Sequence, residues 1–540
     1  MAARKSTKKT TSKTSKASKA AKKTASKTTK SAPHSSDGRP ERFFAGYPAT
    51  VVFAEPGTRK ESGKRALEQL LWGDFVGVRG PRKDGWVRVC TRHVREGWVR
   101  ENEIQKDRLL EVIFVDIGQG DGSLVVTPDD KHMLIDAGQG DNFIRFLRWR
   151  YPQFATRRDF ESIVISHPDA DHYAGFADLF TDNSVNVFVG TIYHNGIIER
   201  ASEKKSETLG PRVKDGDEHY LTDVVTDKSR LDALLADEKV WKGKKYPTML
   251  KRAIDSQRVH DVRMLSEVDK HLPGYGPNDK VTIEVLGPVV EPDRNGKPRL
   301  RWFGELSGTG PTKNGHSVVL RLTYKSVSIL LGGDLNIPSE KLLLQHHTGM
   351  DVPPTNEEER RLVVEAARKI FQVDIAKSCH HGSADFSDLF LEALNPIATV
   401  ISSGDQEPHA HPRSDTLGTV GRFSRGARPL IFSTELSRSA AEAIKKPSIV
   451  REKFRAAQRK IEAAKTAEAK EKAVAAFEKL VNTIQRSIGT YGAVNVRTDG
   501  ERVAIAYKIE TASRKDKLWD IYTLEPEGGV LRFKSKHEEE

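Results

Sequence analysis

The stretch ESIVISHPDADHYAG, residues 161–175, places two histidines and two aspartates directly after an apolar run. The run is typical of a buried strand, and the residues that follow His172 have the spacing of a helix. Side chains at such a transition can converge in one space above a sheet. His167, Asp169, Asp171 and His172 are costly to bury together unless a cation neutralises them. The pattern predicts a metal site, and the alternative is a solvated helix start capped by aspartate.

Three further segments bring the same residue types to the ends of predicted strands. LLGGDLN (330–336) places Asp334 in a glycine-rich turn, SCHHGS (378–383) places His380 and His381 after a strand, and NGHSVVLRL (314–322) begins a strand with His316. Each is weak alone, because a single histidine is more often a core or surface residue. Ligand sites in α/β sheets lie beyond strand ends, so their recurrence strengthens the metal prediction.

Charge is distributed unevenly along the 540 residues. The net charge is +13, and residues 1–40 account for +11 of it, with twelve Lys or Arg and one acid. This tail lacks apolar residues that could form a core, so we expect it to be disordered and to attract polyanions such as nucleic acid. The alternative is a solubilising extension without a partner. The remaining 500 residues are nearly neutral.

The pattern of apolar residues divides the chain into four parts. Short alternating runs suggest a small all-β barrel, and the longer strands interleaved with helices that follow predict an α/β fold. A stripe of Val474, Phe477, Val481 and Ile484 predicts a helical packing or dimerisation surface. The expected parts are a tail (1–42), a barrel (43–106), a main α/β domain (107–436, with a polar insertion at 195–280) and a helical segment with a β-hairpin (437–540).

Composition also bears on location. No apolar run is long enough to span a membrane, and the N-terminus lacks the apolar core of a signal peptide. Cys90 and Cys379 are the only cysteines, too few for a disulfide scaffold. We therefore expect a cytoplasmic protein without a membrane partner.

The order VDIGQGDGSLV, LIDAG, SHPDADHYAG, HSVVLRL, LLGGDLN, CHHGS and HAHPR resembles the metallo-β-lactamase superfamily in its ComEC-type hydrolase branch. The repeated Gly-Trp-Val of residues 85–87 and 97–99 resembles bacterial SH3-like modules. These resemblances imply an αββα sandwich of the metallo-β-lactamase type, preceded by an SH3-like barrel and the basic tail. Trp86 and Trp98 could line a groove for an unknown ligand, although a small barrel also needs aromatic residues in its core.

The resemblance also implies a ligand set for two divalent ions. Site one would consist of His167, Asp169 and His316. Site two would consist of Asp171, His172 and either His380 or His381, and Asp334 would bridge the ions. Asp136 would orient a ligand from behind. The residues implied in catalysis are Asp171, Asp334, His381, His411 and Arg413, the last as a ligand of a phosphate oxygen.

Two positions differ from related patterns. The superfamily usually has His where this chain has Asp169, and this hard oxygen ligand shifts the preference from Zn²⁺ toward Mn²⁺ or Mg²⁺. Many ComEC-type members have Asn where His316 stands. We expect Cys379 to point into the core rather than to bind metal. GQGDGS (118–123) lacks the Lys and spacing of a P-loop and is typical of a turn.

These features favour a metal-dependent phosphodiesterase, and within that class a nuclease that acts on DNA through a metal-activated water. A second hypothesis keeps the metals but assigns a small phosphodiester or another ester as substrate, which the nearly neutral folded part favours. A third hypothesis is a non-catalytic nucleic-acid or protein adaptor. The apparently complete ligand set argues against the third. A homodimer formed through the 448–486 helix is a further expectation.

Overall fold

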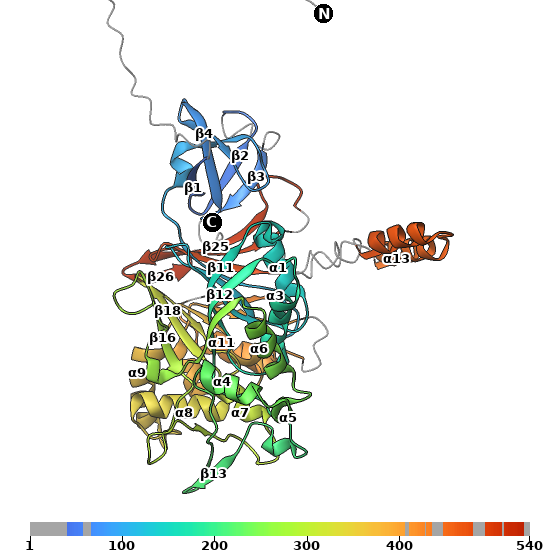
Figure 1. Ribbon diagram of the computed structural model, residues 1–540. Helices are drawn as coiled ribbons and strands as arrows, with labels where there is room; N and C mark the ends of the chain where they lie inside the picture. The colour runs from blue at the N-terminus through green and yellow to red at the C-terminus, as the bar shows by residue number, and fades with distance from the viewer. Residues whose placement is uncertain are drawn as a thin grey trace, which may run out of the picture. The chain divides into compact units, whose positions relative to one another are not determined.

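Two β-sheets with helices outside them form the centre of the protein (Figure 1). The computed structural model describes residues 40–57, 66–404, 410–426, 428–434, 447–478, 492–509 and 512–533. The larger sheet has the strand order β15-β12-β11-β10-β9-β8-β23-β24-β25-β26, and the smaller one has the order β16-β18-β19-β20-β21-β22. Both are mixed sheets, in which parallel pairs such as β10–β11 and β20–β21 bring successive strand ends to one edge.

The strands of the larger sheet are β8 (Leu110–Phe114), β9 (Gly122–Val126), β10 (His132–Ala137), β11 (Arg158–Val164), β12 (Val187–His194), β15 (Val259–Met264), β23 (Val494–Thr498), β24 (Val503–Lys508), β25 (Trp519–Glu527) and β26 (Val530–Phe533). Those of the smaller sheet are β16 (Val281–Gly287), β18 (Val319–Tyr324), β19 (Val327–Leu331), β20 (Ile375–Lys377), β21 (Ala398–Ile401) and β22 (Leu430–Ser433). A separate three-stranded sheet consists of β13 (Arg212–Asp215), β14 (Glu218–Leu221) and β17 (Leu300–Arg301).

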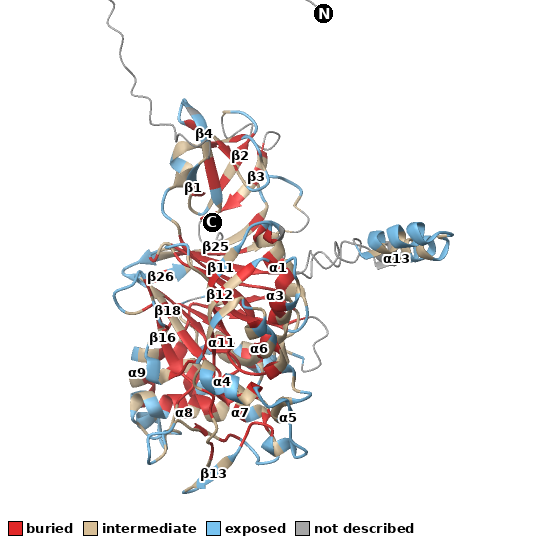
Figure 2. Ribbon diagram, viewed as in Figure 1, coloured by how far each residue is buried: buried red, intermediate tan, exposed pale blue. Residues whose placement is uncertain are grey.

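Alternation along each strand creates the layers. In β10, Met133 and Ile135 face the smaller sheet, and they share a core with Leu320 and Ile329. Leu134 points the other way, into a core with helices on the outer face. Figure 2 shows the strands of both sheets as largely buried. The layers run helix, sheet, sheet, helix, which is the αββα arrangement predicted from the sequence.

Helices cover both outer faces of the sheet pair. The larger sheet packs against α1 (Asn142–Arg150), α3 (Ala177–Thr181), α4 (Lys228–Leu235) and α6 (Lys245–Asp255). The smaller sheet packs against α8 (Ile337–Thr348), α9 (Glu357–Phe371) and α10 (Asp388–Leu394). The remaining described helices include α2 (Ala170–Tyr173), α5 (Glu238–Trp241), α7 (Gly310–Gly315), α11 (Ser414–Phe423) and α13 (Pro447–Glu462).

Two predicted boundaries differ from the structure. The C-terminal strands were assigned to a separate part, but β23 pairs antiparallel with β8 and extends the larger sheet. The 195–280 insertion was expected to be a polar cover, yet β15 pairs with β12 in the same sheet. Within α6, Tyr246, Met249 and Leu250 are buried although charged residues surround them in sequence. Both differences arise because the partners are distant in sequence, so no local pattern announces the pairing.

An antiparallel seven-stranded sheet precedes the sandwich. It comprises β1 (Glu41–Ala45), β2 (Ala49–Phe53), β3 (Ala66–Leu71), β4 (Phe75–Lys83), β5 (Trp86–Cys90), β6 (Gly97–Arg100) and β7 (Ile104–Gln105). It has its own core, which includes Val52, Val76 and Val89. Trp86 is buried beside Phe53, with ring centroids 5.5 Å apart, so this tryptophan serves packing.

The helical segment near the C-terminus is a hairpin in its described part. Helix α13 is followed by a break and by a second helical stretch, residues 467–478. Phe477 of the predicted stripe contacts Phe454 of α13, with ring centroids 5.6 Å apart. Val481, Ile484 and the basic tail up to residue 39 lie outside the described residues. Within the described ranges, every helix is too short or too polar to cross a lipid bilayer.

Candidate metal centre

The ends of four strands bring the predicted site residues together at one edge of the sheet pair. His167 follows β11, and Asp171 and His172 lie on the short helix α2. Asp334 follows β19, and His381 follows β20. Asp136 is the second-last residue of β10. Because strands of both sheets end here, residues separated by more than 200 positions become neighbours.

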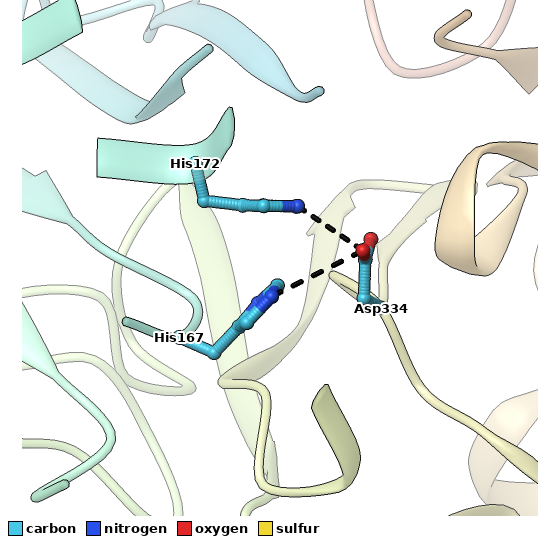
Figure 3. A group of neighbouring side chains, drawn as sticks. All are labelled: His167, His172 and Asp334. Carbon is cyan, nitrogen blue, oxygen red and sulfur yellow. Dashed lines mark ion pairs between the residues drawn. The ribbon is translucent and has the colours of Figure 1, made fainter. Parts of the chain in front are cut away.

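The carboxylate of Asp334 lies at the centre of three imidazoles. Its Oδ2 atom is 3.2 Å from Nε2 of His172, 3.2 Å from Nε2 of His381 and 4.0 Å from Nε2 of His167. Figure 3 shows His167 and His172 pointing toward Asp334 from the same side. Ligands that share an ion at the usual 2.0–2.2 Å are separated by about 3.4 Å in a tetrahedral site. The two shorter separations match that spacing.

The buried polar atoms of this cluster lack hydrogen bonds. Nε2 of His167, His172 and His381, together with Oδ1 of Asp334, are buried and make no hydrogen bond. Buried polar atoms in folded proteins are nearly always hydrogen-bonded, so four such atoms around one point need an explanation. A divalent cation explains them, because imidazole nitrogen and carboxylate oxygen are its usual donors. The residues therefore fit a metal ion.

The other ring nitrogen of each histidine is engaged within the chain. Nδ1 of His172 lies 2.9 Å from Oδ2 of Asp136, and Nδ1 of His381 lies 3.1 Å from the carbonyl oxygen of Ser402. Nδ1 of His167 lies 3.1 Å from Oγ of Ser166. Such contacts fix ring orientation and leave Nε2 for the metal.

Ionisation within the cluster favours charged carboxylate. Burial alone would raise the pKa of Asp334, but His172 and His381 hold it well below its usual range. Burial alone would lower the pKa of His172, yet Asp334 and Asp136 raise it well above the ordinary value. Burial and the neighbouring His172 hold the pKa of His167 well below its ordinary value. Asp334 therefore carries a full negative charge at neutral pH.

The histidine pair of SCHHGS is resolved by its geometry. His381 faces the cluster, and its Nε2 is also 3.7 Å from Oδ2 of Asp171. His380 lies outside the groups that could hold an ion among the described residues. Both histidines have positive φ, 48° and 56° respectively, which is uncommon for residues other than glycine. This turn aims the two rings differently, with His381 toward Asp334.

Cys379 packs against the core under α8 and α9, as expected.

The predicted site one is only partly assembled. His167 is in place, but His316 turns away: its Nε2 lies 2.6 Å from the carbonyl oxygen of Arg301, and its ring stacks on Phe303. The sequence suggested that His316 begins a strand. Instead it ends helix α7, and this change in backbone direction points its ring away from the cluster. The structure thus does not support His316 as a ligand.

Asp169 has partners within the chain. Its Oδ1 forms an ion pair with Lys313, and its Oδ2 lies 3.7 Å from Nε2 of His167. With its amide oriented to satisfy its neighbours, Asn314 donates to Oδ2 of Asp169 at 2.9 Å. Sequence reasoning missed Lys313 and Asn314, although both precede the His316 that it selected.

A second missed pair lies behind His381. Lys377, the last residue of β20, is buried and forms an ion pair with Asp121. Oδ1 of Asp121 is 3.2 Å from Nδ1 of His381. Asp121 belongs to GQGDGS, which was interpreted only as a turn. A lysine at the end of an apolar strand was the available signal, because a buried ammonium group needs a partner.

The late motif lies beside the histidine pair. The ring of His411 stacks near that of His381, with centroids 6.3 Å apart. The backbone N–H of Arg413 donates to the carbonyl oxygen of Gly382 at 2.8 Å, and its side chain is exposed. The structure therefore brings His411 and Arg413 to the rim of the cluster.

Comparison with known proteins agrees with this arrangement. The model of the metallo-beta-lactamase superfamily matches residues 116–380. No curated protein matches the chain. One similar solved structure is that of MEM-A1, a subclass B3 metallo-beta-lactamase isolated from a soil metagenome library. The two share 14% identity over 50% of this chain and 79% of that chain, with a TM-score of 0.23, which is too low to add weight.

Strand order, layering, the histidine–aspartate cluster and the family match coincide over one segment. The segment that the metallo-beta-lactamase superfamily model matches, residues 116–380, includes His167, His172 and Asp334, and members of that superfamily are generally metal-dependent hydrolases.

Proposed function

We propose that the protein is a metal-dependent phosphodiesterase and that its substrate is DNA. The observation that carries the proposal is the set of three unbonded imidazole nitrogens around Asp334. Asp171, His172, Asp334 and His381 would hold a divalent ion, and Nε2 of His167 lies farther out, 4.0 Å from Oδ2 of Asp334. When bound, the ion would supply positive charge to activate water and to offset negative charge on the group under attack.

Cationic side chains at the rim support a phosphate substrate. Arg413 is exposed next to Gly382, and its guanidinium group can bind two phosphate oxygens at once. Lys313 is also near the cluster, and its charge is paired with Asp169. The basic residues 1–40 would add sequence-independent attraction to nucleic acid, which weakens as salt increases. Together these groups favour a polyanionic substrate over a neutral ester.

A small phosphodiester is the second candidate. Outside residues 1–40 the chain carries a net charge of only +2, which does not resemble a surface built along a duplex. The adaptor hypothesis has less support, because a binding scaffold has no need for unbonded nitrogens buried around a carboxylate. The ComEC-type branch, the SH3-like assignment of residues 43–106 and a dimer remain predictions.

The test is hydrolysis by protein stripped of metal and reloaded separately with Mn²⁺, Zn²⁺ or Mg²⁺. Single-stranded DNA, double-stranded DNA and bis-p-nitrophenyl phosphate are compared. Asp334→Asn removes the shared carboxylate, and Asp351→Asn, at an exposed position, is the matched control. We expect metal-dependent DNA cleavage that Asp334→Asn abolishes and Asp351→Asn preserves. Turnover of the small ester alone would favour the second candidate, and no turnover with any ion would contradict phosphodiester hydrolysis.

Deletion of residues 1–39 separates binding from chemistry. We expect the deleted protein to cleave bis-p-nitrophenyl phosphate at the full rate but to bind DNA more weakly at low salt. Equal DNA affinity with and without the tail would contradict its role in substrate attraction.

A further inference from the structure

Lys313 lies against Asp169, one of the residues predicted to bind the first of two metal ions. It lies on helix α7, and only 13% of its side chain is exposed. Its Nζ atom forms an ion pair with Oδ1 of Asp169 and lies 3.6 Å from Oε1 of Glu199. A largely buried ammonium group needs such carboxylates, because desolvation of an unpaired charge is costly. Lys313 and Asp169 therefore satisfy one another.

The remaining contacts of Asp169 also engage its carboxylate within the chain. Asn314 donates to its Oδ2 atom at 2.9 Å, so both carboxylate oxygens have partners in the chain. The histidine expected to complete site one, His316, is bonded to the carbonyl oxygen of Arg301. Only His167 of the predicted site one keeps an unbonded donor atom.

The donor atoms around Asp334 differ from those of Asp169, because they lack hydrogen bonds. His172, His381 and Asp334 each have a buried polar atom without a hydrogen bond, and Asp171 lies within reach of His381. Every group of described residues suited to a metal ion contains His172 or His381, and Asp169 is in none of them. One set of donors is thus open, while in the other set Lys313 engages Asp169 and only His167 keeps an open donor atom.

We propose that the chain binds one divalent ion tightly among Asp171, His172, Asp334 and His381, and that the ammonium group of Lys313 takes the place of a second ion against Asp169. The proposal deepens the metal-dependent function above but does not depend on the identity of the substrate. Two of the four donors of the tight site are imidazoles, which favours Zn²⁺ over Mg²⁺.

The experiment counts retained ions by mass spectrometry of the metal content. Full-length protein without an affinity tag is stripped, incubated with excess Zn²⁺ and desalted. We expect about one equivalent for the wild type and about two for Lys313→Met, in which Asp169 is released. Lys313→Arg, which keeps the charge, should stay at one. Lys228→Met removes a lysine from an exposed ion pair with Asp232 and should also stay at one.

The double variant Lys313→Met/Asp169→Asn controls for indirect effects. If the second ion of Lys313→Met binds through Asp169, the double variant returns to one equivalent. Two equivalents in the wild type would overturn the proposal. So would one equivalent in a folded Lys313→Met protein, as judged by circular dichroism and an unchanged thermal midpoint.

The metal counts separate failure of the Lys313 proposal from failure of the proposed function. No retained ion in any variant would overturn both the metal-dependent function and this proposal. One equivalent in the wild type and two in Lys313→Met, without cleavage of DNA, would support the role of Lys313 while contradicting the nuclease.

Discussion

Asp136 lies behind His172, with its Oδ2 atom 2.9 Å from Nδ1 of that ring. The other oxygen accepts a hydrogen bond from the backbone N–H of Ser166 at 2.8 Å. Asp136 has a positive φ of 53°, a conformation that aspartate tolerates better than most residues. The carboxylate thus ties the end of β10 to the segment that follows β11. Its effect is to present Nε2 of His172 to Asp334.

We therefore expect Asp136→Asn to weaken metal binding without removing a ligand. Loss of such a partner typically lowers metal affinity about 10–100-fold. Competition with a fluorescent chelator measures the Zn²⁺ affinity of the two proteins. Asp159→Asn, at an exposed position, should leave the affinity unchanged. Equal affinities for Asp136→Asn and the wild type would show that His172 does not need this orientation.

The buried pair Lys377–Asp121 is expected to matter for stability. Lys377→Met removes the ammonium partner of the buried Asp121 carboxylate, and breaking such a pair costs about 3–5 kcal/mol. The double variant Asp121→Asn/Lys377→Met should recover most of that loss. Urea denaturation of metal-free protein at neutral pH provides the free energies of unfolding. Lys280→Met, at an exposed ion pair, is the control. A double variant as unstable as Lys377→Met would contradict the pair as the cause.

The buried side chain of Glu340 should make the free energy of unfolding fall as pH rises. Burial raises the pKa of this α8 side chain to about 8, although the N–H of Ser387 donates to Oε2 at 2.5 Å. Between about pH 4.5 and 8 the folded state binds more protons than the unfolded state, so the free energy of unfolding decreases as pH increases. The cost above pH 8 is on the order of 5 kcal/mol.

Glu340→Gln should remove this contribution. Its urea midpoint should exceed that of the wild type at pH 8, and the difference should shrink toward pH 5. Glu365→Gln, on the exposed face of α9, should follow the wild type at both values. Parallel pH profiles for Glu340→Gln and the wild type would mean that Glu340 is already ionised in the folded protein.

Arg497 connects the seven-stranded sheet to the sandwich. From β23, its Nη1 atom donates to the carbonyl oxygen of Trp72 at 2.6 Å and to Oδ1 of Asp74 at 2.8 Å. We expect Arg497→Met to lower the free energy of unfolding by about 3 kcal/mol, since it leaves buried partners unsatisfied. Hydrogen exchange should accelerate within residues 66–90. Arg532→Met, which is exposed, should change neither measurement. Unchanged exchange in Arg497→Met would contradict this connection.

Local sequence pattern was sufficient for the cluster residues that follow strands. His167, His172, Asp334 and His381 each stand after an apolar run, and strand ends place such residues at one edge whatever their distance in sequence. The alternation of strands and helices predicted a layered α/β fold, and the family resemblance implied its αββα arrangement. What pattern does not encode is the direction of a ring after a short helix, and this explains the error at His316.

Long-range partners were also outside the reach of local pattern. The residues next to Lys313 in sequence do not indicate that its partner is Asp169, which lies 144 residues earlier. The same holds for Lys377 and Asp121. β15 and β23 each pair with strands that are distant in sequence, so a division drawn from composition separated them from the sheet that they extend.

The most direct test of the metal centre is the position of bound Zn²⁺ in crystals of zinc-loaded protein, located by anomalous diffraction. We predict the strongest peak at about 2.0–2.2 Å from Nε2 of His172, Nε2 of His381 and a carboxylate oxygen of Asp334. A fully occupied ion bound elsewhere, with those three side chains free of metal, would contradict the assignment of this cluster as the metal centre.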